Sequence, residues 1–299
     1  MRQQLKKALG HFGYEIHLVR RHAQQPGSRE PQASLTDRFS VNPVWPLPRD
    51  ESGPSPEVIR QEFAKYEDWH YAYEFQGGLS FSRRYKQNGL GSQPKLDRRR
   101  PLQRFRHFMP SLLEANHGSL KGKRVLDIAS NSGFWSLQFA LLGAEVVGFD
   151  ARPDLIEQAN LIKRIVGAKN VNFQVLDFWD MRPESLGGKF DVVLCLGILY
   201  HLPWPIDALR LVKSMSREHI LVDTEVYPAP DSVVHLRWEE PNDIRNANRT
   251  GIVAAPSKRG IEMILREIGV VESFEIPLRA TDMPQDYLDQ RRASWLIKV

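Results

Sequence analysis

Three acidic residues stand where buried strands are predicted to end. Asp127 lies in an apolar stretch that runs into a turn, Asp150 follows it 23 positions later, and Asp177 ends a third apolar stretch. In an open parallel sheet, the carboxyl ends of the strands meet at one edge, and ligands bind there. An ionised carboxylate only accepts hydrogen bonds. We therefore expect these acids to bind a ligand that carries hydroxyl, amino or cationic groups.

The turn after the first predicted strand contains a single glycine, Gly133, where nucleotide-binding turns carry two or three. Ala129 and Asn131 replace the others, so the backbone approaches a phosphate less closely. Asp127 adds a negative charge beside the turn, which repels a phosphate. A dinucleotide is therefore disfavoured, and a dehydrogenase is the least favoured enzyme class. S-adenosylmethionine (SAM) has no phosphate, and its sulfonium and ammonium groups suit this turn better.

The predicted cofactor site follows from the chemistry of SAM. Asp150 is expected to accept hydrogen bonds from both ribose hydroxyls, and Asp177 from the adenine amino group. Phe178 or neighbouring apolar residues are expected to lie against the adenine ring. The residues predicted to contact the cofactor all lie at the same rim of the sheet: Asp127, Ala129, Asn131, Gly133, Asp150, Ala151, Asp177, Phe178, Leu196 and Gly197.

Strands and helices must alternate to bring these residues together. From residue 119 onward, apolar runs separated by helical patterns predict a parallel sheet with helices on both faces. Two late strands are joined by a loop too short for a crossover helix, so the last strand is predicted to be antiparallel. The predicted fold class is α/β, a Rossmann-like doubly wound sheet of about seven mostly parallel strands. The predicted strands are 123–129, 144–150, 171–177, 190–197, 219–226, 270–278 and 292–299.

Two domains are predicted. Residues 1–100 form an N-terminal helical and irregular extension with a lid region, and residues 101–299 form the sheet domain, with an insertion at about 227–256. A short basic amphipathic helix at 2–12 is expected either to make weak contact with a membrane surface or to pack against the protein. An aromatic group in the extension is expected either to cover the cofactor or to pack in the core: Trp69, His70, Tyr71 and Tyr73.

Composition limits the remaining classes. The only cysteine, Cys195, excludes an internal disulfide and is expected in the core, and the nine histidines lack metal-ligand spacing, so no metal is expected. No apolar segment is long enough to cross a bilayer, and no secretory signal begins the chain, so we expect a cytoplasmic location. A basic cluster at 83–106 is either a solvated surface or a binding surface for RNA or another phosphate-bearing substrate.

The motifs resemble those of class I SAM-dependent methyltransferases, with the pattern V-L-D-x-G-x-G-x-G and acids that close the second and third strands. The segments 196–212 (LGILYHLPWPIDALRLV) and 244–270 also resemble the tRNA wobble-uridine carboxymethyltransferase family. This narrower resemblance implies tRNA as an alternative partner and carboxy-S-adenosyl-L-methionine as an alternative cofactor. The L-Y-H segment is shared with methyltransferases that act on sugars and other small metabolites.

Methyl transfer to a hydroxyl requires removal of the acceptor proton. His201 is the predicted general base because it follows a strand that delivers it to the rim, and because histidine is the usual side chain for proton transfer in catalysis; a structural histidine is the alternative. Tyr200 is expected to line the cofactor or orient the acceptor. Asp223 and Glu225 close the fifth strand, where either can serve as a base or bind the acceptor, and arginines of the 227–256 insertion, Arg245 and Arg249, can also hold a polar acceptor.

The favoured function is methyl transfer from SAM to a small molecule, with an oxygen of a sugar or natural-product intermediate as the favoured target. The alternatives are a tRNA wobble-uridine methyltransferase or carboxymethyltransferase, and a SAM-binding protein without catalysis. The sequence leaves the oligomeric state open.

Overall fold

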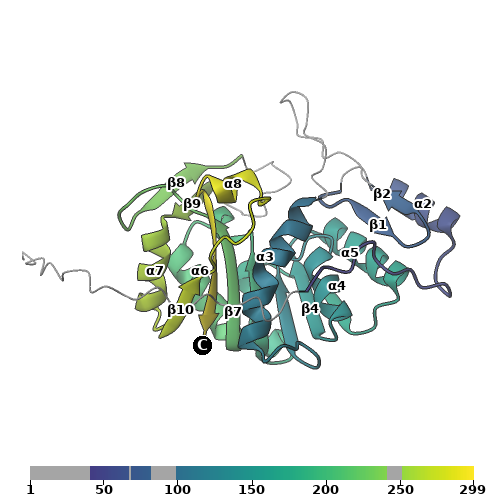
Figure 1. Ribbon diagram of the computed structural model, residues 1–299, viewed down its shortest axis with the longest axis horizontal. Coiled ribbons are helices and arrows are strands. Elements are labelled where there is room, and N and C mark those ends of the chain that lie inside the picture. The colour runs from purple at the N-terminus through teal and green to yellow at the C-terminus, as the bar shows by residue number, and fades with distance from the viewer. Residues whose placement is uncertain (1–40, 67–68, 82–98, 241–250) are drawn as a thin grey trace, which may run out of the picture. The chain divides into compact units, whose positions relative to one another are not determined.

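The computed structural model describes residues 41–66, 69–81, 99–240 and 251–299 (Figure 1). All of them belong to one compact unit, residues 37–299. The expected helix at 2–12, most of the basic cluster at 83–106, and the two insertion arginines lie outside the described residues. Within the described ranges, no helix has the length and apolar character needed to cross a membrane. The cytoplasmic location stays a prediction.

The centre of the unit is a seven-stranded sheet in the order β10-β11-β7-β6-β3-β4-β5. Neighbouring strands from β7 to β5 are parallel, whereas β11 runs antiparallel to both β7 and β10. The predicted fold class, including the antiparallel last strand, is confirmed. The strands are β3 (Arg124–Ile128), β4 (Glu145–Asp150), β5 (Val171–Val175), β6 (Phe190–Leu196), β7 (Ser216–Glu225), β10 (Glu272–Glu275) and β11 (Arg292–Lys298).

Helices cover both faces of this sheet (Figure 1). Alternate residues of a strand face opposite sides, so Val125 of β3 packs into one apolar layer while Leu126 and Ile128 pack into the other. The first layer includes α3, α4 and α5, and the second includes α6, α7 and the buried Cys195, as predicted for this thiol. The helices are α3 (Arg99–Ala115), α4 (Phe134–Leu141), α5 (Pro153–Val166), α6 (Pro205–Met215), α7 (Lys258–Glu267) and α8 (Gln285–Leu288).

Shorter elements extend from this core. Helix α2 (Pro56–Ala64) begins at the expected place, because the Ser55 side chain accepts a hydrogen bond from the Val58 N–H and proline follows at the first helical position. It precedes a hairpin of β1 (Tyr73–Phe75) and β2 (Leu79–Phe81). The predicted insertion contains a second hairpin, β8 (Val234–Trp238) and β9 (Ile252–Pro256). The domain boundary near residue 100 stays a prediction.

Three short 3-10 helices follow strands β5 and β6: η2 (Phe178–Asp180), η3 (Glu184–Leu186) and η4 (Leu199–His201). Two of them begin directly after the carboxyl end of a parallel strand. Side chains of η2 and η4 therefore lie near the rim where an α/β sheet binds its ligand.

Candidate active site

The turn between β3 and α4 keeps the backbone of a glycine-rich turn although two glycines are replaced. Ala129, Asn131 and Gly133 have φ angles of 54°, 52° and 84°, all in the left-handed region that favours glycine. The Asn131 side chain stabilises this shape, because its Oδ1 accepts a hydrogen bond from the Ser132 N–H at 2.7 Å. The turn thus keeps the form expected of a nucleoside-binding loop.

Tyr73 holds the same turn from the core. Its hydroxyl donates to the Ser132 carbonyl at 2.6 Å and lies 3.0 Å from the Ser132 hydroxyl, and the ring is fully buried. Trp69 is also buried, stacked on Phe63 with ring centres 4.3 Å apart. These two members of the aromatic group are core residues. Tyr71, together with His70, lines the cavity described below, so a covering role stays a prediction for that pair.

Asp127 lies beneath the turn. Its Oδ2 accepts hydrogen bonds from the Ser136 N–H at 3.0 Å and the Ser136 hydroxyl at 2.6 Å, which fastens the start of α4 to β3. Burial raises the pKa of Asp127 to about 7, while the hydrogen bonds from Ser136 act to lower it. The carboxyl group is not part of the cavity lining in the described structure, and its contact with the cofactor stays a prediction.

Asp177 and Phe178 are also not among the residues that line this cavity. The Asp177 carboxylate accepts a hydrogen bond from the Trp179 N–H at 2.9 Å and caps η2. Phe178 is buried in the second apolar layer, with its ring centre 5.0 Å from that of Trp179. Their predicted adenine contacts, and that of Ala151 with the cofactor, stay predictions.

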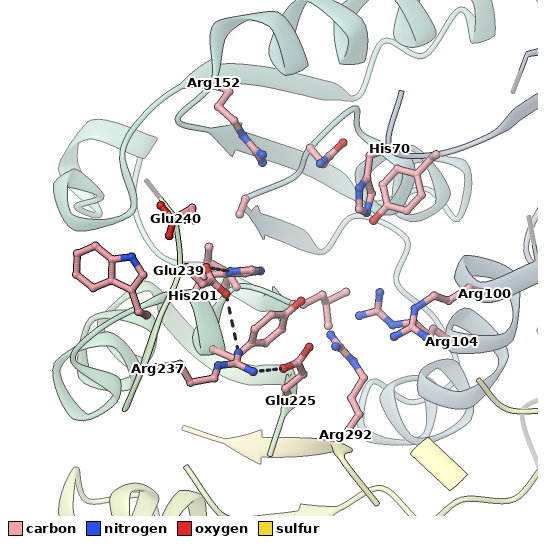
Figure 2. Close-up of a pocket in the computed structure, with 18 residues that line it drawn as sticks. His70, Arg100, Arg104, Arg152, His201, Glu225, Arg237, Glu239, Glu240 and Arg292 are labelled. Atoms are coloured by element: carbon pink, nitrogen blue, oxygen red, sulfur yellow. Dashed lines mark hydrogen bonds and ion pairs between the residues drawn. The ribbon is translucent and has the colours of Figure 1, made fainter. Parts of the chain in front are cut away.

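A cavity of about 570 Å³ opens at the rim of the sheet beside the turn (Figure 2). It brings together seven of the residues predicted from sequence: Ala129, Asn131, Leu196, Gly197, Tyr200, His201 and Glu225. Arg100 and Arg104 of α3, which the sequence analysis placed in the basic cluster, also line it. The sequence analysis assigned no role to the other charged lining residues, which come from the turn after β4, the β8 hairpin and β11: Arg152, Arg237, Glu239, Glu240 and Arg292.

His201 is paired with a glutamate from the β8 hairpin. The Glu239 carboxylate lies 2.8 Å from His201 Nδ1, so Nδ1–H donates to it and the other ring nitrogen, Nε2, is the one suited to accept a proton. Arg237 links the hairpin further, because its guanidinium lies 3.0 Å from Glu225 and 3.9 Å from Glu239. Glu225 therefore lies in the cavity as half of an ion pair, and its catalytic role stays a prediction.

Asp223 corrects one sequence expectation. Its carboxylate is fully buried and accepts hydrogen bonds from Arg104 and Arg292 at 2.6 and 2.7 Å and from Tyr287 at 2.5 Å. Burial acts to raise the pKa of Asp223, but the two guanidinium groups outweigh it and hold the pKa well below its usual range. An acceptor cannot reach this carboxylate, so Asp223 positions two arginines of the cavity and is not a base.

Fold and site define the class of protein. Residues 119–245 match a family model described as a methyltransferase domain. The fold is also similar to the N-terminal domain of EvdMO1, solved in the presence of SAH and D-fucose, with a TM-score of 0.64, 22% identity, and coverage of 84% of this chain and 98% of that chain. The match and the fold agree with the predicted methyltransferase domain over residues 119–245. The use of SAM as its cofactor stays a prediction.

The narrower resemblance is also confirmed. The chain is 30% identical to the tRNA U34 carboxymethyltransferase of Wolinella succinogenes over 193 residues, or 62% of this chain and 64% of the relative. It is 30% identical to the ubiquinone biosynthesis O-methyltransferase of Bordetella parapertussis over 121 residues, or 40% and 48% of the two chains. The chain spans about half the length of the curated relatives it matches.

Proposed function

We propose that this chain transfers the methyl group of SAM to a hydroxyl oxygen of a neutral, polar small molecule of the sugar or natural-product kind. The observation that carries this proposal is the pair of His201 and Glu239 inside the cavity beside the β3 turn. SAM supplies a methyl group that is already activated on a sulfonium. The residues of the chain have to bind and orient the two molecules and take the proton of the acceptor.

His201 is suited to take that proton. The Glu239 carboxylate fixes the imidazole ring by its contact with Nδ1 and stabilises the imidazolium that forms when Nε2 is protonated. Tyr200 is adjacent in η4 and lines the same cavity, with its ring beneath the guanidinium of Arg292 at 5.3 Å. This contact fixes the tyrosine at the cavity wall, where it is placed to orient the acceptor.

The charges around the cavity favour a neutral acceptor. Each of the five lining arginines has an acidic partner in the described structure: Asp286 for Arg100, Asp223 for Arg104 and Arg292, Asp150 for Arg152, and Glu225 for Arg237. An anionic acceptor that binds Arg100, Arg104, Arg237 or Arg292 has to break one of these ion pairs.

The tRNA alternative has support from the names of the relatives, which include tRNA U34 carboxymethyltransferases. Against it, Arg100 and Arg104 of the basic cluster lie in ion pairs with Asp286 and Asp223. These two residues do not form a solvated surface for phosphates. The carboxy form of the cofactor carries an extra negative charge, which has to compete with the acids that already pair with the cavity arginines. In contrast, EvdMO1, a relative in fold, was solved with the neutral sugar D-fucose.

Formation of SAH from SAM tests the proposal, with a panel of glycosides and polyhydroxylated small molecules as acceptors and total tRNA as the rival. With an active acceptor, His201→Ala is expected to lower kcat by about 10²–10⁴-fold, the usual contribution of a general base. Glu239→Gln is expected to lower it by less, because the ring keeps a hydrogen-bond partner. Both variants are expected to bind SAH with an affinity within about threefold of the wild type, which is a change in binding free energy below 1 kcal/mol.

His117→Asn is the matched control, because His117 is exposed after α3, at the opposite end of β3. Full turnover in His201→Ala contradicts the role of the base. SAH formation that requires tRNA, with no active small molecule, contradicts the proposed acceptor class.

A further inference from the structure

The carboxylate of Asp150, the predicted partner of the cofactor ribose, is already occupied by donors of its own chain. Oδ1 accepts from the backbone N–H of Arg152 at 3.1 Å and from its Nε at 2.9 Å. Oδ2 accepts from the backbone N–H of Asn131 and from Nη2 of Arg152, both at 3.1 Å. An ionised carboxylate has about four acceptor positions. All four are filled, so a ribose diol can bind Asp150 only if a donor leaves.

Only the side chain of Arg152 is able to leave. The two backbone donors belong to the turns that follow β3 and β4, so their positions are set by the fold. The Arg152 side chain, by contrast, is 25% exposed and lines the cavity, whereas Asp150 beneath it is 1% exposed. Figure 2 shows Arg152 reaching into the cavity from the turn after β4. Its guanidinium therefore separates Asp150 from the cavity.

We propose that the guanidinium of Arg152 occupies the place of the ribose hydroxyls on Asp150 and is displaced when the cofactor binds. We call this side chain the plug of the ribose subsite. Its Nε–H and Nη2–H donate in parallel to the two carboxylate oxygens, as the two hydroxyls of a ribose are expected to do. Binding of the cofactor then moves the guanidinium off Asp150 into the cavity. This inference rests on the proposed use of SAM and names a residue that sets the strength and specificity of cofactor binding.

The plug has a measurable consequence for affinity. A ligand that binds only the open form has an apparent affinity reduced by the fraction of molecules that are open. Arg152 also adds a positive charge that opposes the sulfonium of SAM, whereas SAH has no sulfonium and reports the opening of the subsite alone. Arg152→Met keeps a long flexible side chain but removes both the donors and the charge. If the plug is closed about nine-tenths of the time, this variant binds SAH about tenfold more tightly.

Isothermal titration calorimetry of the full chain with SAH tests this. We expect about tenfold tighter binding in Arg152→Met and weaker binding in Asp150→Asn, which keeps the shape of the side chain but removes its charge. Arg210→Met is the matched control and is expected to bind like the wild type, since Arg210 forms an exposed ion pair with Asp207 on α6. In the wild-type protein, the NMR signal of Arg152 Nε–H, assigned by its loss in Arg152→Met, is expected to shift at saturating SAH.

The outcomes separate the two proposals. SAH binding by the wild type that is unchanged or weaker in Arg152→Met overturns the plug and leaves the cofactor site intact. An Arg152 Nε–H signal that does not shift at saturating SAH also overturns the plug, and this measurement is made on the wild-type protein. Absence of SAH binding in both the wild type and Arg152→Met refutes cofactor binding, and with it both proposals.

Discussion

At the scale of the residue, the turn after β3 requires a left-handed backbone more than it requires glycine. Ala129 adopts that backbone without help from a polar side chain, and Asn131 does so with its side-chain oxygen bonded to the Ser132 N–H. Gly133 is different, because a Cβ atom at this position would lie 2.7 Å from Phe173 Cζ. Glycine is therefore retained where a side chain would collide with the core.

Two substitutions in this turn are expected to have opposite effects on stability. A left-handed backbone costs a residue with a Cβ atom about 1–2 kcal/mol. Ala129→Gly removes this cost but adds the larger backbone entropy that glycine loses on folding, so we expect the free energy of unfolding to rise by up to about 1 kcal/mol. Gly133→Ala adds both backbone strain and overlap with Phe173, and is expected to lower it by about 2 kcal/mol or more. Urea unfolding measures both. Effects of the same sign contradict this account.

The sequence predicts the residues that follow strand ends, because their place depends only on the order of strands and helices. Tyr200, His201 and Asn131 reach the cavity for this reason. The arginines of the cavity depend on long-range pairing, which local patterns do not reveal. One signal was available for Arg104: it lies one helical turn before Phe108, on the buried face of α3.

At the scale of the element, strands with a clear pattern of buried apolar residues were predicted from the sequence, and strands without such a pattern were not. Strand β6 is apolar at every position except Asp191 and is buried at all positions but its last, so its type was clear. Strand β8 is mostly exposed and has no such pattern, so the sequence indicated an insertion at 227–256 but no hairpin. This hairpin contributes Arg237 and leads into Glu239, so the part of the cavity that it lines was the least predictable.

Strand β1 holds the turn after β3 through the hydroxyl of Tyr73. Tyr73→Phe removes the donor to the buried Ser132 carbonyl, and leaves that carbonyl without this partner. We expect a loss of about 1–3 kcal/mol in the free energy of unfolding, the range for an unsatisfied buried polar group, together with weaker SAH binding because the turn is less well fixed.

Chemical denaturation and calorimetry check this, with Tyr66→Phe as control. The Tyr66 hydroxyl contacts Glu157 at 3.3 Å in an exposed position, so that variant is expected to unfold and bind SAH nearly as the wild type does. Equal effects of the two substitutions would show that β1 does not hold the turn.

At the scale of the whole molecule, Asp223 joins segments that are far apart in the sequence. Its carboxylate, on β7, binds Arg104 of α3, Tyr287 of α8, and Arg292 and Ser294 of β11. The two arginines also line the cavity. The same buried carboxylate therefore fixes the antiparallel end of the sheet against α3 and sets the position of two cations at the site.

Asp223→Asn keeps the shape of this side chain and removes its charge, leaving two buried guanidinium groups without their carboxylate. Breaking a buried ion pair costs about 3–5 kcal/mol, and urea unfolding at pH 7 is expected to show a loss of that size. Asp207→Asn, which breaks the exposed ion pair with Arg210, is expected to cost less than about 1 kcal/mol.

The effect of Asp223→Asn is also expected to depend on pH. Because the pKa of Asp223 is held well below its usual range in the fold, its stabilisation is complete above the pKa of the unfolded chain, about 3.9, and is lost progressively as the pH falls below that value. The difference between wild type and Asp223→Asn should therefore be constant from about pH 7 to pH 5 and shrink below about pH 4. A difference that is small at pH 7, or that grows on acidification, contradicts the role of Asp223 as the charged centre that joins these segments.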